Sequence, residues 1–476
     1  MTTFNRTRVF LKKVFAKKTP SGKSSCEKEE QPEVKKPVAK EQSKLVHCPT
    51  YEIIPPDDGL EVVDAADKHL LSETYYHGII DNDEIEELLN RNGDFLICIL
   101  EGDSQSRIIW TVRSEGRPKF VAIGRKGEKF QIAGKSFDQI PDMVKHYMTT
   151  REPIHPGSKI VVKRPIPHKE WLISHDRVRL EDEIGKGAFG KVYKGTLQVG
   201  HDFQTVAVKT YAGHAKDRSK TASFLQEART MREYKHENVL QMLGIACQKE
   251  PLMIVLEFCG GGSLLKQHLR KQGARLGIPI RYRFSKEASA GLRYLEEMKC
   301  IHRDVAARNC LLTENTLTVK ISDFGLSIKR QRMVEAEDEI VLPTKWLAPE
   351  VIRKRQFTSK TDVWSFGVLL YEIFTDGSEP YPGLSNAEVR EKLTNGSNFR
   401  MQLPLEIPPG ITRLIDSCWM EEPSKRPTFK DINFRMQLPL EIPPGITRLI
   451  DSCWMEEPSK RPTFKDINKT LTKIEF

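Results

Sequence analysis

Residues 301–312 read IHRDVAARNCLL and place Asp304 five positions before Asn309. Two short motifs follow in order, DFG at residues 323–325 and APE at residues 348–350. Carboxylate and amide oxygens are the ligands that Mg²⁺ prefers, and a carboxylate within reach of a substrate can also accept a proton. Asp304, Asn309 and Asp323 are therefore candidates for acid–base chemistry or for cation binding, and the motifs elsewhere in the chain bear on the choice.

A glycine-rich stretch lies upstream, where residues 183–192 read EIGKGAFGKV with Gly185, Gly187 and Gly190 in the pattern G-x-G-x-x-G. Glycines let backbone amides approach phosphates closely, because no Cβ atoms stand in the way. The pattern alone also fits a dinucleotide-binding turn or a plain glycine-rich hairpin. A dinucleotide fold needs a helix directly after the glycines. Here a β-branched run, VAVK, ends at Lys209, which favours a hairpin followed by a lysine-bearing strand.

A carboxylate that can hold this lysine lies in FLQEARTM, where Glu227 falls on a helical pattern 18 residues after Lys209. Such an ion pair directs the ammonium toward the α- and β-phosphates of a nucleotide. The order and spacing of all these motifs resemble the protein-kinase signature set. The resemblance implies a two-lobed kinase domain over residues 178–476 that uses ATP and Mg²⁺.

The resemblance also implies a role for each residue of the site. The implied catalytic residues are Asp304, Arg308, Lys209 and Glu227, with Asp304 accepting the proton of the substrate hydroxyl. The implied nucleotide-binding residues are Ile184, Gly185, Lys186, Gly187, Ala188, Phe189, Gly190, Lys191, Val192, Lys209, Glu257 and Cys259, the last two in the hinge that would bind adenine. The implied metal ligands are Asn309 and Asp323.

The catalytic loop also indicates which hydroxyl is the acceptor. Serine/threonine kinases usually carry a lysine two positions after the catalytic aspartate, whereas this chain has Ala306 there and Arg308 further on. This loop and PTKWLAPE at residues 343–350 resemble the corresponding segments of tyrosine kinases. The implied activity is transfer of the ATP γ-phosphate to protein tyrosine residues. The alternative is a catalytically silent adaptor or scaffold.

Residues 75–165 form a separate unit. IDNDEIEELLNRNG predicts a helix with Ile85, Leu88 and Leu89 on one face, SFDQIPDMVKHYMT predicts a second helix, and FLICIL, RIIWTVRS and KFVAIG predict strands. YYHGIID and GDFL resemble parts of a Src-homology 2 (SH2) domain. The expected fold class is α+β multidomain, with an SH2-like domain followed by a two-lobed protein kinase domain.

The order of the two domains, together with KEWLISHDRVRLEDEIGKGAFG, is most similar to the Fes/Fer family of non-receptor tyrosine kinases from Tyr75 onward. Before that residue we expect a disordered basic arm over residues 1–70, in place of the membrane-bending domain typical of the family. Short, nematode-type members of the family would fit this layout. The family implies signalling inside the cell and substrates with tyrosine.

The SH2-like unit departs from its family at the phosphate-binding position. The family pattern G-D-F-L-V-R-E-S supplies an arginine to the phosphate, and Cys98 occupies that place here. Asn82 stands where a helix arginine is expected, and Lys119 where a strand histidine is expected. A phosphotyrosine ligand is therefore doubtful. A structural role, in which the domain docks on the smaller lobe of the kinase, is the other interpretation.

The segment between DFG and APE also departs from the family. Residues 326–342 read LSIKRQRMVEAEDEIVL and contain no tyrosine. Glu335 falls where the family has one, and a carboxylate there would supply part of the charge of a phosphate, with Arg303 as its partner. This predicts activity without phosphorylation of the segment. The alternative interpretation is that the acidic residues of this segment form a solvated loop without a regulatory contact.

The 35 residues 399–433, FRMQLPLEIPPGITRLIDSCWMEEPSKRPTFKDIN, return unchanged as residues 434–468. The segment resembles the end of a kinase's larger lobe, which has one place for it. A solenoid needs more copies, so a tandem duplication with one copy displaced, or an exon counted twice in the gene model, is the better explanation. Glu350 has two candidate partners, Arg426 and Arg461, and the first copy is expected to dock because it follows its natural predecessor.

Charge and composition limit the partners. Residues 1–50 carry 12 Lys and Arg against 5 Glu, so these 50 residues hold +7 of the net charge of +10. A nucleic-acid-binding surface is not expected. Residues 1–18 fit a helix on an anionic membrane surface, a solvated tail or a transit peptide. The 9 cysteines form no CxxC pair, and Thr2 excludes myristoylation. We expect a cytoplasmic protein, with the inner face of the plasma membrane as its peripheral site.

Overall fold

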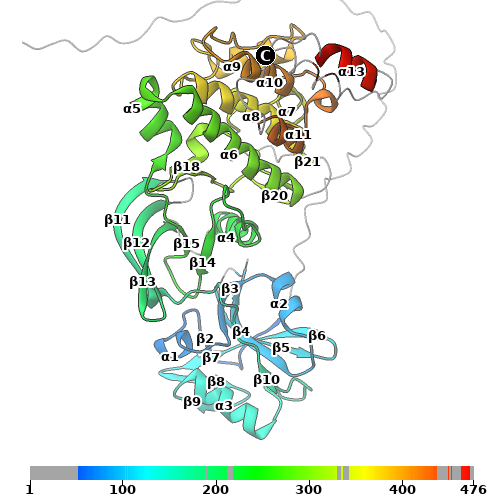
Figure 1. Cartoon of the computed structure of the whole chain (residues 1–476). Coiled ribbons are helices and arrows are strands. Elements are labelled where there is room, and N and C mark those ends of the chain that lie inside the picture. Colours follow the sequence, from blue (N-terminus) through cyan, green and yellow to red (C-terminus); the bar gives the residue numbers. More distant parts are fainter. Residues whose placement is uncertain are drawn as a thin grey trace, which may run out of the picture. The chain divides into compact units, whose positions relative to one another are not determined.

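The computed structural model describes residues 52–101, 103, 105–187, 190–211, 218–329, 334–335, 342–436, 449, 452 and 462–471. Predictions for the basic arm before residue 52, for Ala188 and Phe189, and for most of the second copy lie outside the described residues. Figure 1 shows the SH2-like unit in blue and cyan and the kinase unit from green to red.

The SH2-like unit is built on a central sheet in the order β1-β6-β5-β4-β10, with β3 paired to β4. The bounds are β1 (Ile53–Ile54), β3 (Tyr76–Ile80), β4 (Asp94–Leu100), β5 (Ile108–Ser114), β6 (Arg117–Ala122) and β10 (Arg164–Pro165). Side chains alternate along β4, so Phe95 and Ile97 enter one core cluster while Leu96 and Cys98 enter the other. The three strands predicted from the sequence are therefore confirmed.

Two helices flank this sheet, α2 (Asn82–Leu88) and α3 (Ile140–Thr150), as the sequence predicts. Asp81 caps α2, because its Oδ1 accepts the backbone N–H of Glu84 at 2.7 Å. Ile85 and Leu88 of this helix are buried, in agreement with the predicted apolar face. A smaller sheet in the order β2-β7-β8-β9 completes the unit, formed by β2 (Glu61–Val62), β7 (Gly124–Lys126), β8 (Lys129–Ile132) and β9 (Lys135–Phe137).

The predicted boundary of the arm at residue 70 is wrong for its last part. Strand β1 pairs with β6, strand β2 pairs with β7, and α1 (Lys68–Leu71) follows before the SH2 motifs begin. Val63 and Leu70 are buried in the core of the SH2-like unit, which orders this segment. The sequence-based prediction missed them because they are few and follow a long polar stretch.

The smaller lobe of the kinase unit contains a five-stranded antiparallel sheet, order β11-β12-β13-β15-β14, and helix α4 (Arg218–Arg232). Its strands are β11 (Val178–Lys186), β12 (Lys191–Val199), β13 (Asp202–Thr210), β14 (Met242–Ala246) and β15 (Met253–Glu257). The glycine-rich stretch is the turn between β11 and β12, which is the hairpin that the sequence favours. Lys209 lies one residue before the end of β13.

The larger lobe is mainly helical, and its first long α-helix is α6 (Ile278–Glu297). Its other long helix, α8 (Ser359–Phe374), is almost completely buried. The remaining elements are α5 (Arg270–Gln272), α7 (Pro349–Lys354), α9 (Asn386–Thr394), α10 (Pro409–Cys418), α11 (Phe429–Arg435), α13 (Phe464–Leu471), and short strands β16 (Gly262–Ser263), β17 (Cys300–Ile301), β18 (Cys310–Leu312), β19 (Val319–Ile321), β20 (Ile328–Lys329), β21 (Val334–Glu335) and β22 (Gln356–Phe357).

The first copy of the duplicated segment completes this lobe. Arg426 donates to both carboxylate oxygens of Glu350, at 2.6 and 2.9 Å, and its side chain is fully buried. Trp419, from the same copy, is buried beside Gly367 of α8, where an added Cβ would lie 2.6 Å from the indole nitrogen. The prediction that the first copy pairs with Glu350 is confirmed. Arg461 of the second copy lies outside the described residues.

Candidate active site

Lys209 and Glu227 meet in the interior of the smaller lobe. The Lys209 ammonium donates to both oxygens of the Glu227 carboxylate at 2.7 Å. Strand β13 positions the lysine and helix α4 the glutamate, so the pair joins sheet to helix. Burial raises the pKa of Glu227, and the nearby ammonium acts in the opposite direction. A bidentate pair in this place fixes the direction of the lysine toward the cleft.

The catalytic loop converges on Asp304. Asn309 donates through Nδ2 to the main-chain oxygen of Asp304 at 2.8 Å and to its Oδ2 at 2.6 Å. Arg308 donates to the other carboxylate oxygen, Oδ1. Both oxygens of the predicted base are therefore held, and Asn309 keeps its amide oxygen for another partner. Arg308 and Asn309, two other residues of the predicted site, thus both lie within hydrogen-bonding distance of Asp304.

The DFG segment has its phenylalanine inside and its aspartate at the cleft. The ring of Phe324 is buried against His302 and Tyr234, with centroid distances of 5.1 and 5.5 Å. Asp323 has a left-handed backbone with φ of 66° and is exposed to the cleft. A non-glycine residue in that conformation is strained and is typical of functional sites. The burial of Phe324 holds Asp323 on the cleft side.

A cleft of about 490 Å³ lies between the two lobes. It has an apolar wall formed by Val192, Ala207 and Leu256. The residues predicted from the sequence that line it are Ile184, Gly185, Lys186, Gly187, Val192, Lys209, Glu227, Glu257, Cys259, Arg308, Asn309 and Asp323. Gly190 is adjacent, since its carbonyl accepts the backbone N–H of Gly187 at 2.8 Å, whereas the Lys191 ammonium pairs with Glu183 at 2.7 Å instead of lining the cleft.

The residues of the cleft fit a magnesium nucleotide. Asp323 offers an exposed carboxylate and Asn309 an amide oxygen, which are the ligand types that Mg²⁺ takes together with phosphate oxygens. Lys209 supplies a fixed positive charge and the glycine turn supplies backbone amides. The apolar wall suits a planar base.

Two buried acids on α8 escaped the sequence-based prediction. The carboxylate of Asp362 accepts the backbone N–H groups of His302 and Arg303, at 2.7 and 2.9 Å, and Glu372 is 1% exposed beneath the catalytic loop. Burial raises the pKa of Asp362 to about 7. The signal that could have found them is the run DVWSFGVLLYEIF, because a charged residue in such an apolar helix needs a buried partner.

The phosphate-binding face of the SH2-like unit is apolar. Cys98 is fully buried, its Sγ lies 3.4 Å from Thr111 Oγ1, and burial raises the pKa of the thiol to about 12. Phe120 shares this core cluster, so alternation along β6 directs Lys119 to the opposite face. Lys119 therefore lies on the other face of the sheet from Cys98, and its role as a point charge for a phosphate stays a prediction. Leu100, two residues after Cys98 on β4, is buried in the same core cluster as Cys98.

The segment between DFG and APE is described only in part. The backbone of Val334 and Glu335 pairs with Phe357 and Gln356. The side chain of Glu335 lies outside the described residues, so its predicted contact with Arg303 stays a prediction. The described guanidinium of Arg303 lies 4.4 Å from the centre of the Phe357 ring.

The fold and the cleft define an SH2 domain followed by a two-lobed protein kinase. The family model "Protein tyrosine and serine/threonine kinase" matches residues 178–436, and the "SH2 domain" model matches residues 75–147. The chain therefore belongs to the protein kinase family, and its relatives place it with the Fer and Fps kinases.

Three relatives support this placement. The chain is 38% identical to tyrosine-protein kinase Fer of Homo sapiens over 374 residues, which cover 78% of this chain and 44% of Fer. It is 39% identical to Fer-related kinase 1 of Caenorhabditis elegans, over 76% of this chain and 92% of that protein. The transforming protein Fps of avian sarcoma virus (strain PRCII) is 36% identical, over 81% and 70%. The chain thus spans less than half of human Fer.

Among the residues that the structure describes, none of the helices combines the length and the hydropathy needed to cross a bilayer.

Proposed function

We propose that this chain is a non-receptor protein tyrosine kinase that transfers the γ-phosphate of ATP to protein tyrosine residues. The observation that carries the proposal is the joint geometry of the cleft. Lys209 is held by Glu227 at 2.7 Å, and Asp304 is held by Arg308 and Asn309. The names and identities of the Fer and Fps relatives support tyrosine as the acceptor.

In this mechanism Asp304 accepts the proton of the tyrosine hydroxyl, and the phenol oxygen forms the new bond to the γ-phosphorus. The bond from that phosphorus to its bridging oxygen breaks and ADP leaves. Lys209 orients the phosphates, while Asn309 and Asp323 would hold Mg²⁺, which neutralises charge on the phosphate oxygens when bound. Arg308 keeps the carboxylate of Asp304 in the orientation that receives the proton.

Tyrosine specificity is supported by the place of Arg308. Its guanidinium carbon lies 4.3 Å from the centre of the Trp346 ring, in the PTKWLAPE segment. The residue that positions the base therefore also contacts the segment on which the substrate is expected to lie. A lysine at the position of Ala306 would instead place a charge beside the base, as in serine/threonine kinases.

We propose that the SH2-like domain supports helix α4 instead of binding free phosphotyrosine. An SH2 domain anchors phosphate with a bidentate arginine, and Cys98 with its apolar neighbours offers no charge for this purpose. The acids of this domain bind two arginines of α4 instead. Arg229 contacts Asp81 at 3.0 Å and also Glu101, and Arg232 contacts Glu84 at 2.8 Å.

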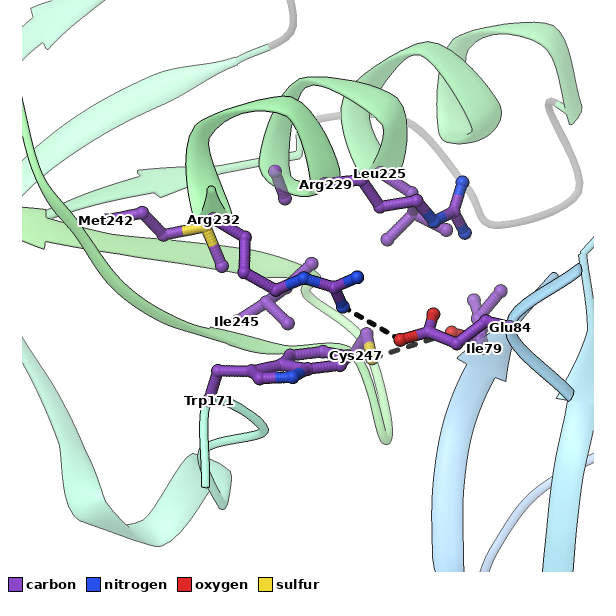
Figure 2. Close-up of a pocket in the computed structure, with 10 residues that line it drawn as sticks. Ile79, Glu84, Trp171, Leu225, Arg229, Arg232, Met242, Ile245 and Cys247 are labelled. Atoms are coloured by element: carbon purple, nitrogen blue, oxygen red, sulfur yellow. Dashed lines mark hydrogen bonds and ion pairs between the residues drawn. The ribbon is translucent and has the colours of Figure 1, made fainter. Parts of the chain in front are cut away.

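Backbone contacts reinforce these ion pairs. Figure 2 shows Arg229 and Arg232 extending from α4, with Arg232 joined to Glu84 and Cys247 joined to Ile79. The N–H of Ile79 donates to the carbonyl of Cys247 at 3.0 Å. Gly78 permits this approach, because its φ is 67° and an added Cβ would lie 2.4 Å from the same carbonyl oxygen.

We also propose a cytoplasmic site of action, with residues 1–18 as a contact to anionic membrane. The +7 charge of residues 1–50 supports the contact, and the free thiols among the described cysteines fit a reducing compartment. Binding of the full chain to phosphatidylserine vesicles, and loss of that binding in a chain lacking residues 1–18, would test it.

The test of the main proposal is phosphate transfer from ATP with Mg²⁺ to peptides that contain only tyrosine or only serine. We expect transfer to tyrosine peptide alone, lost by about 10³-fold or more in Asp304→Asn, which keeps the size of the side chain but not its basicity. Transfer to the serine peptide alone would refute tyrosine as the phosphate acceptor. A silent wild-type chain that still binds ATP would favour the adaptor.

A further inference from the structure

Glu372 of α8 joins two segments of the active site through one oxygen atom. Its Oε2 accepts the backbone N–H of Ala307 at 2.9 Å and the indole N–H of Trp346 at 3.0 Å. Ala307 belongs to the catalytic loop, and Trp346 belongs to the segment that ends at APE. The carboxylate thus holds both segments from below, out of contact with the cleft.

The contacts continue from Trp346 to the base. The indole ring lies under the Arg308 guanidinium at 4.3 Å, and Arg308 donates to Oδ1 of Asp304. A displacement of Trp346 would therefore move the group that orients Asp304. Since Ala307 directly precedes Arg308 in the chain, both ends of this arginine depend on the same carboxylate.

Burial of a carboxylate among apolar side chains is unfavourable unless hydrogen bonds or nearby charges compensate for the lost hydration. The helix around it is apolar, and burial raises the pKa of Glu372 to about 7, opposed by the Trp346 and Ala307 hydrogen bonds and by Arg308 and Arg270. Without an acceptor, two buried N–H groups would lose their partners. An apolar residue would fill the helix equally well, so the requirement for a hydrogen-bond acceptor at this position arises from the two donors.

We propose that Glu372 is a positioning residue of the kinase reaction, which sets the distance between the base Asp304 and the tyrosine-binding segment by accepting from Ala307 and Trp346 at once. The inference rests on the proposed tyrosine kinase activity.

The test compares three variants of the full chain with tyrosine peptide, ATP and Mg²⁺. Glu372→Leu removes the acceptor, and we expect kcat to fall about 10–100-fold through misplacement of the base, with KM for ATP within about threefold because the nucleotide groups are untouched. Glu372→Gln keeps an oxygen that accepts both N–H groups, so kcat should stay within about threefold of wild type. Trp346→Phe loses one bond and should lie between them.

The control for lost packing is Trp364→Phe, on the same helix. Trp364 is fully buried, and its indole N–H has no hydrogen-bond partner among the described residues. We expect this variant to lower Tm while leaving kcat unchanged. If it loses as much kcat as Glu372→Leu, packing alone explains the effect and the inference fails.

The remaining outcomes are also decisive. Unchanged kcat in Glu372→Leu, or equal losses in the Leu and Gln variants, would overturn the positioning role. If Glu372→Leu shows no cooperative unfolding transition, Trp346→Phe decides, and an unchanged kcat in that variant refutes the inference. A wild-type chain without tyrosine transfer would refute the proposed function itself, which no result on Glu372 alone can do.

Discussion

His77 shows how one buried side chain makes stability depend on pH. Its ring is 5% exposed, and its Nε2 lies 3.0 Å from the carbonyl oxygen of Ile166. Burial lowers the pKa of His77 from 6.5 to about 4. The unfolded chain therefore binds a proton near pH 6.5 that the folded chain refuses until about pH 4, so this contribution to stability is complete above pH 6.5 and is lost as pH falls toward 4.

We expect the free energy of unfolding of the SH2-like unit to fall by roughly 2 kcal/mol between pH 7.5 and pH 5 through His77. Thermal unfolding followed by the fluorescence of the buried Trp110 would measure it. His77→Gln keeps the hydrogen bond through its amide but does not titrate, so its Tm should change less over this range. Equal pH slopes in the two proteins would contradict the assignment to His77.

Helix α4 is contacted both by the sheet of the smaller kinase lobe and by the SH2-like unit. One face carries Glu227, the partner of Lys209, and the last two turns carry Arg229 and Arg232. The guanidinium of Arg232 also lies 4.4 Å from the centre of the Trp171 ring. Partly buried ion pairs of this kind contribute more than exposed ones, because solvent screens them less. The position of Glu227 therefore depends on contacts outside the kinase lobe.

We expect the double variant Arg229→Ala/Arg232→Ala to lower kcat about 10-fold, because α4 loses its support and the Lys209–Glu227 pair is populated less. Steady-state kinetics with tyrosine peptide would measure this. Lys235→Ala, which removes an exposed charge just beyond the same helix, should have no effect. A double variant with wild-type kcat would show that the contacts of the SH2-like domain with α4 do not affect the kinase reaction.

At the scale of the whole chain, the repeated segment poses a choice between two identical sequences. Glu350 has two oxygens, and Arg426 occupies both while also donating to the carbonyl oxygens of Met420 and Lys360. A copy that directly follows α9 closes a shorter loop than one that starts 35 residues later, so loop-closure entropy also favours the first copy.

Arg426→Ala should therefore destabilise the larger lobe by about 3–5 kcal/mol, since it leaves the Glu350 carboxylate without its buried partner. This corresponds to a fall in Tm on the order of 10 °C. Arg461→Ala, the same change in the second copy, should leave Tm within about 1 °C. Differential scanning calorimetry of both variants decides the matter, and equal losses would show that the second copy also bears on the fold.

The residues of the candidate active site and much of the local structure could be predicted from the amino-acid sequence. Asp304, Asn309 and Asp323 are recognisable because phosphoryl transfer demands particular side chains at short spacing. The helix at residues 82–88 and strand β4 follow from hydrophobic periodicity, which depends on neighbouring residues only. The absence of an arginine at Cys98 was equally visible, because a single position decides it.

Which distant groups meet became clear from the three-dimensional structure. It brought Glu372 within 2.9 Å of Ala307, 65 residues away, placed Lys119 on the opposite face from Cys98, joined residues 53–54 to β6, and paired Glu350 with the first of two identical arginines. None of these follows from local pattern, because burial and partner choice depend on packing and on loop closure between segments far apart in the chain.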